Sequence, residues 1–178
     1  MKIRDDRGSQ IVELAVALPF LVVLLWGIMD FGNAFNTKQK ISTAAREVAR
    51  YSSNQSTLDL SEDDPPSIEA AKNVLASTLV NAHLNPCGID SNVTPAKSDV
   101  ETWAFTSQGN CPDKLILKIE RANVFQMADG TNVISTRVTV TYPLVWHFGK
   151  VVWLIAKGAN YGGSSIQISV QSVMANLT

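Results

Sequence analysis

Residues 7–35 read RGSQIVELAVALPFLVVLLWGIMDFGNAF, and this stretch decides the fold. Every residue between Glu13 and Asp30 is apolar, proline or glycine. A helix needs about 20 predominantly apolar residues to cross the hydrocarbon core of a bilayer, and apolar residues outside the two acids extend the run to about 25. The sequence therefore predicts a membrane-spanning helix that continues to Tyr51, with Pro19 as the expected place for a kink.

Two ordinary explanations of this apolar run are a cleaved secretory signal and an uncleaved signal anchor. A secretory signal is followed by a small-residue cleavage site, whereas residues 30–35 read DFGNAF. A signal anchor needs only the apolar run and flanking charges. It gives no reason for Glu13, because an ionisable group beside an apolar core is costly and usually marks function. The uncleaved anchor stays open as an alternative.

A third interpretation starts from the residues before the helix. Residues 1–8 form a short charged leader, Gly8 and Ser9 form a small-residue junction, and Glu13 lies five residues after Gly8. This arrangement resembles type IV prepilins, in which a membrane peptidase cuts after the glycine on the cytoplasmic side. Glycine lacks Cβ and lets a peptidase approach the backbone closely.

Three further motifs extend the resemblance: Leu18-Pro19, GIMDFG at residues 27–32 and AAREVAR at residues 44–50. With them, about the first 50 residues resemble the TadE-like minor pilins, or pseudopilins, of the tight-adherence (Flp-type) pilus system. Leu14 is a departure, since the family usually has Phe or Tyr directly after the glutamate.

The resemblance implies a role, partners and a location. A prepilin peptidase would cut between Gly8 and Ser9, and Glu13 would pair with the N-terminal amine of a neighbouring subunit. The implied partners are the inner membrane, the peptidase, other pilin and pseudopilin subunits and pilus assembly proteins. The N-terminus would be cytoplasmic and the C-terminal domain periplasmic. The subunit would be non-enzymatic and would act in assembly of an adhesive pilus, within the filament or beneath it.

Length and charge limit the alternatives. The 178 residues hold the helix and one domain of about 120 residues, which is large enough for its own core. The formal net charge of −1 gives no electrostatic footprint for nucleic acid. We expect a leader at 1–8, the transmembrane and extended helix at 9–52, and a periplasmic α+β domain at 53–178.

The two cysteines, Cys87 and Cys111, lie beside turn residues in the expected domain. Such positions favour a single disulfide in an oxidising compartment, and two unpaired thiols are the alternative. Metal binding is disfavoured because the chain has no further cysteine and no clustered histidine. The cysteines therefore favour a domain outside the cytoplasm.

The remaining pattern predicts a small α+β domain of the pilin type. After an acidic loop, residues 65–84 have a helical apolar face, with Asp64 expected as N-cap and Asn85-Pro86 expected to stop the helix. From Cys87 onward apolar residues alternate with polar ones, which is typical of half-buried antiparallel strands. The expected strands are 100–106, 114–121, 133–142 and a closing strand at 166–174.

Residues 144–156, LVWHFGKVVWLIA, are unusually apolar for this domain. The run is too short to span a bilayer and is typical of a buried core helix or an interfacial segment. Trp146 and Trp153, seven residues apart, share one face of such a helix. In the interfacial alternative they would rest on the membrane surface or on a partner.

Catalytic motifs are missing from the sequence. Neither His83 nor His147 lies in a motif with a nucleophile or a metal ligand, and no cofactor-binding motif occurs. We therefore expect no enzymatic activity, no cofactor and no metal. Besides the pilin-like subunit, an uncleaved signal-anchored periplasmic binding domain and a tethered periplasmic enzyme stay as alternatives.

Overall fold

The computed structural model of the chain describes residues 6–99, 101–147 and 165–176. These residues form two compact units. The first holds the described residues up to Phe35 together with Trp146 and His147, and the second holds Asn36–Val145 and the described residues from Ser165 onward. The predicted long helix and antiparallel sheet are both present, which confirms the α+β class.

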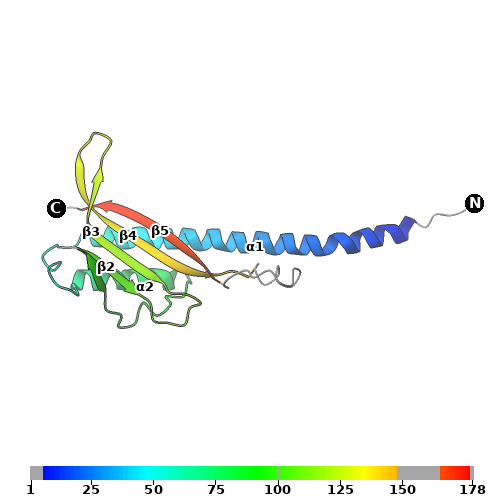
Figure 1. Ribbon diagram of the computed structural model, residues 1–178, viewed down its shortest axis with the longest axis horizontal. Helices are drawn as coiled ribbons and strands as arrows, with labels where there is room; N and C mark the ends of the chain where they lie inside the picture. The colour runs from blue at the N-terminus through cyan, green and yellow to red at the C-terminus, as the bar shows by residue number, and fades with distance from the viewer. Residues whose placement is uncertain (1–5, 100, 148–164, 177–178) are drawn as a thin grey trace, which may run out of the picture. The chain divides into compact units, whose positions relative to one another are not determined.

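Helix α1 spans Asp6–Ser53 and carries Pro19 in its interior (Figure 1). Its residues Gln10–Ser53 are long and apolar enough to cross a membrane, by length and composition, and its most apolar window is not buried within the chain. Since large apolar side chains exposed in this way must be covered by lipid or by other proteins, α1 is the candidate anchor.

The second unit contains the last part of α1, from Asn36 to Ser53. Ile41, Ala45 and Val48, which recur at helical spacing, are fully buried there. Phe35 and Lys38, which precede them at the same spacing, are exposed. The compact second unit thus begins inside the helix, ahead of the expected segment boundary at residue 53.

The rest of the second unit holds helix α2, Pro66–Asn81, and a five-stranded antiparallel sheet in the order β1-β2-β3-β4-β5 (Figure 1). One face of the sheet and the buried faces of α1 and α2 make a single core, in which Trp103 and Phe105 are the largest apolar side chains. The strands are β1 Ala96–Asp99, β2 Thr102–Thr106, β3 Ile116–Gln126, β4 Asn132–Val145 and β5 Ser165–Ala175.

Strand β4 contains a proline, Pro143, without losing a sheet hydrogen bond. Asn176 donates its N–H to the carbonyl of Ile134 on the β5 side of β4. Because successive residues of a strand bond to opposite neighbours, the odd-numbered residues of β4 face β3. On this side of β4 the last pairing is that of Thr141 with Ile116 of β3. The backbone nitrogen of Pro143 faces the same side beyond this last pair, where no N–H is needed, as expected for strand prolines.

Helix α2, Pro66–Asn81, begins and ends differently from the prediction. Its N-cap is Pro65, which makes no side-chain cap, so the Asp64 assignment was wrong. Instead Asp59 accepts the N–H of Ser67 at 2.9 Å. At the other end His83 adopts a φ of 55°, in the αL position that closes helices. The helix therefore ends before Asn85-Pro86, the predicted stop.

Candidate functional site

The N-terminal part of α1 carries the residues of the predicted processing site. Gly8 and Ser9 lie in the first turn of the helix, which begins at Asp6. The first four N–H groups of a helix have no intrahelical partner, so opening this turn breaks few hydrogen bonds. A Cβ added at Gly8 would meet no atom within 4 Å. The backbone at the predicted scissile bond is therefore unobstructed by the described residues.

Glu13 lies one turn further along and is exposed. It borders a shallow groove on the surface of α1, whose lining is Gly8, Val12, Glu13, Val16, Ala17 and Phe20. Apart from Glu13, this strip consists of glycine and apolar side chains, so that a single carboxylate lies on an otherwise apolar surface. Such a surface can receive another apolar helix that brings a positive charge, because pairing is the usual way in which a charge near lipid is tolerated.

The other acid of the apolar run, Asp30, is buried. Nδ1 of His147 lies 3.6 Å from its carboxylate oxygen. Next to this pair, the rings of Phe31 and Trp146 meet edge to face with centroids 5.4 Å apart. Sequence analysis did not predict this cluster, although an acid at the end of an apolar run signals that a partner is needed.

The apolar segment predicted at 144–156 begins as a strand, because β4 continues to Val145. Its first two residues are thus not helical, contrary to the expected core helix, whereas the interfacial alternative stays a prediction. Trp146 is half-buried against α1. Trp153 lies outside the described residues, so the expectation that the two indoles share one helical face stays a prediction.

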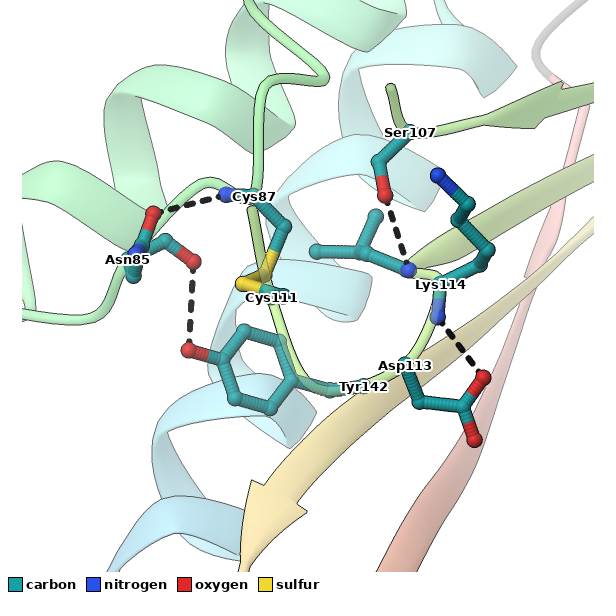
Figure 2. The surroundings of a disulfide bond; sticks show 8 residues. Asn85, Cys87, Ser107, Cys111, Asp113, Lys114 and Tyr142 are labelled. Atoms are coloured by element: carbon teal, nitrogen blue, oxygen red, sulfur yellow. Dashed lines mark hydrogen bonds between the residues drawn. A yellow bond between two sulfur atoms is a disulfide. The ribbon is translucent and has the colours of Figure 1, made fainter. Parts of the chain in front are cut away.

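Cys87 and Cys111 form a disulfide with Cα atoms 5.4 Å apart (Figure 2). Asn85 organises the surroundings, since its side-chain oxygen accepts the N–H of Cys87 at 2.9 Å and its carbonyl accepts the hydroxyl of Tyr142 at 3.1 Å. Burial raises the pKa of the Tyr142 phenol above its ordinary value. The disulfide thereby joins the loop after α2 to the loop between β2 and β3.

Glycine is required where these two loops touch. The N–H of Gly109 donates to the carbonyl of Cys87 at 2.8 Å. A Cβ at Gly109 would lie 2.4 Å from that carbonyl oxygen, which is backbone and cannot move aside easily. The close approach of the loops explains why a glycine precedes Cys111 by two residues.

Arg121 is a buried cation that sequence analysis missed. Its Nη2 donates to the carbonyl of Gln55 at 2.9 Å, just beyond the end of α1. Burial lowers the pKa of this guanidinium, and the nearby carboxylates of Asp59 and Glu101 act in the opposite direction. The contact holds the chain as it leaves the helix. Among the described residues, no group of three or more potential metal ligands occurs.

Comparison with protein families identifies the N-terminal segment. The family described as TadE-like protein matches residues 8–50. This segment is TadE-like. The match confirms the resemblance read from Gly8, Glu13 and the motifs downstream of them.

The TadE-like segment begins at Gly8 and ends at Arg50, inside α1, so it does not include the sheet. Comparison with the curated proteins and with the solved structures gives no match. The family match supports a pilin-like protein associated with the tight-adherence pilus, and the exposed apolar helix is consistent with a single-pass membrane anchor.

Proposed function

We propose that this chain is a non-enzymatic minor pilin, or pseudopilin, of a tight-adherence type IV pilus. A prepilin peptidase removes residues 1–8, α1 holds the mature chain in the inner membrane, and the sheet domain faces the periplasm. The subunit then acts in pilus assembly and so in surface adhesion. The observation that carries the proposal is the TadE-like match over residues 8–50 of an exposed apolar helix.

The spacing of Ser9 and Glu13 gives the proposal a physical basis. Cleavage after Gly8 creates an ammonium group on Ser9, four residues before Glu13 and therefore on the same helical face. Each mature subunit then carries one cation and one anion near the same end of its anchor. Two neighbouring subunits can satisfy both charges by pairing reciprocally, which offsets the desolvation of each group.

Intact mass measurement tests the processing step. The full-length chain is co-expressed with its cognate peptidase, and we expect the product to lack residues 1–8. Gly8→Ala is expected to block the cut. Gly32→Ala is the matched control, because Gly32 also lies in α1 and an added Cβ there meets no atom within 4 Å. A wild-type chain that keeps its initiator methionine and is indifferent to Gly8→Ala would overturn the proposed processing.

A second experiment tests assembly separately from cleavage. Glu13→Gln is expected to leave the leader removal intact and to abolish co-purification with the other pilus subunits, because the neighbour's amine loses its charged partner. Glu47→Gln is the control, since Glu47 is an exposed acid on the same helix. Equal recovery of partner subunits with both variants would exclude the charge-pairing step.

The alternative function, an uncleaved signal-anchored periplasmic binding domain, has one observation in its favour. A pocket with a mixed polar and apolar lining lies beside Arg121 at the end of α1, and its lining comes from Ser53, the loop after the helix, β4 and Asn176. An uncleaved chain in the mass experiment would favour this function over the pilin.

A further inference from the structure

The cluster around Asp30 marks the end of the exposed apolar part of α1. Met29 and Phe31 on either side of Asp30 are 69% and 57% exposed, whereas Asp30 itself is 8% exposed. Trp146 and His147 follow β4 directly in the chain, and they lie against Phe31 and Asp30 respectively. At this level of α1, the apolar side chains of Met29 and Phe31 are exposed and the carboxylate of Asp30 is buried.

The contact with His147 is one interaction that favours an acid at this position. A buried carboxylate that lacks a partner is strongly unfavourable, and a cationic or hydrogen-bonding neighbour offsets much of that penalty. Nδ1 of His147, 3.6 Å from the Asp30 carboxylate, lies within ion-pair distance and is a cationic neighbour when the imidazole is protonated. The interaction brings Trp146 to the helix from a position more than one hundred residues later in the sequence.

The depth of Trp146 follows from its contact with Phe31. Beyond Phe31, α1 exposes polar side chains, Asn33, Asn36 and Lys38, with Phe35 as an exposed ring among them. The hydrocarbon boundary of a spanning α1 therefore falls between Phe31 and Phe35. The Trp146 ring meets Phe31 edge to face at a centroid distance of 5.4 Å and therefore lies at that boundary. Tryptophan is enriched at this level of membranes, where its ring is partly apolar and its N–H reaches water.

We propose that Trp146 is a membrane-interface anchor. Its indole lies in the headgroup region of the bilayer leaflet at which α1 emerges, and the Asp30–His147 pair holds it there. The partner is the lipid surface itself. The inference rests on the proposed membrane-spanning role of α1, and it adds a second point of membrane attachment, at the end of β4.

Quenching of tryptophan fluorescence by brominated phosphatidylcholine tests this proposal. The full chain is reconstituted in vesicles that carry bromine either high or low on the acyl chains. The chain has four tryptophans, and variants that keep a single one are made by Trp→Phe substitution. Trp26, in the apolar part of α1 and 46% exposed, is the membrane control, and the fully buried Trp103 is the core control.

We expect quenching of Trp146 by shallow bromine more than by deep bromine, stronger quenching of Trp26 by deep bromine, and none of Trp103. If Trp26 is quenched and Trp146 is not, the interface anchor is refuted while the membrane-spanning role of α1 stands. If neither Trp26 nor Trp146 is quenched, both the interface anchor and the membrane-spanning role of α1 are refuted. Stronger quenching of Trp146 by deep bromine would place it inside the hydrocarbon core and would also refute the proposal.

A second measurement avoids replacing the core tryptophan. The difference between the wild type and Trp146→Phe isolates the signal of Trp146 with Trp103 in place. In the wild-type background His147→Ala is expected to abolish this lipid-quenched component, because the indole loses its support on α1. His83→Ala is the control, since His83 is exposed and belongs to the second unit. Unchanged quenching in His147→Ala would refute the role of the pair.

Discussion

Removing the Cys87–Cys111 disulfide is expected to lower the free energy of unfolding of the sheet domain by about 3.5 kcal/mol. The two cysteines are separated by 24 residues. Opening a loop of this length restores the corresponding chain entropy to the unfolded state, which sets the magnitude. Domains of this size have total stabilities of about 5–15 kcal/mol, so the variant is expected to stay folded at 25 °C with a much smaller margin.

The perturbation is Cys87→Ala/Cys111→Ala. Alanine is chosen because Cys87 is fully buried, and a serine hydroxyl there would add an unsatisfied polar group. Urea unfolding of the full chain in detergent micelles is followed by tryptophan fluorescence, in which Trp103 reports the core. The reduced wild type serves as a control and should behave like the variant. A decrease of less than about 1 kcal/mol in both would refute the loop-entropy reasoning.

Three further predictions concern the backbone and the pH dependence. His83→Gly is expected to stabilise the domain by about 0.5–1 kcal/mol in urea unfolding because glycine adopts positive φ freely, whereas Ala82→Gly, at φ −81°, should destabilise it. Gly109→Ala should destabilise the domain by more than Gly130→Ala does, because the Cβ at Gly109 meets backbone atoms, whereas Gly130→Ala adds only the strain of a φ of 85°; equal losses would contradict this. The raised pKa of Tyr142 means that its contribution to stability is complete below pH about 10 and decreases above it. Urea midpoints measured across this range should therefore fall less steeply in Tyr142→Phe than in the wild type.

Sequence patterns predicted the helices and strands in which buried residues recur at a regular spacing. The alternation of Val138, Val140 and Tyr142 with polar residues located β4, and these three side chains are buried in the core. Strand β1, Ala96–Asp99, was missed because all four of its residues are exposed, so it carries no period-two signal. Antiparallel pairing with β2 holds β1 in the extended conformation, which the sequence of β1 itself does not predict.

Contacts between distant residues were beyond the reach of such patterns. The cap of α2 comes from Asp59, eight residues before Ser67, where no capping rule looks for it. The neighbours of the Arg121 guanidinium are Gln55 and Asp59, in the loop after α1, and Glu101, just beyond β1. The alternation within β3 therefore indicated only a strand. In the candidate site, Gly8 and Glu13 were found by spacing, whereas the partner of Asp30 required the three-dimensional fold.

The TadE-like segment divides into two parts with different physical roles. Ala44, Ala45, Val48 and Ala49, in the second part, are fully buried in the core of the chain's own domain. They are thus unavailable to other subunits, although small residues on a helix would permit a close helix–helix contact. The apolar residues before Asp30 are exposed to whatever surrounds the chain. Under the proposed function, we therefore expect other pilus subunits to contact the first part of the segment, around Glu13, and we expect substitutions of the buried residues in the second part to act through stability.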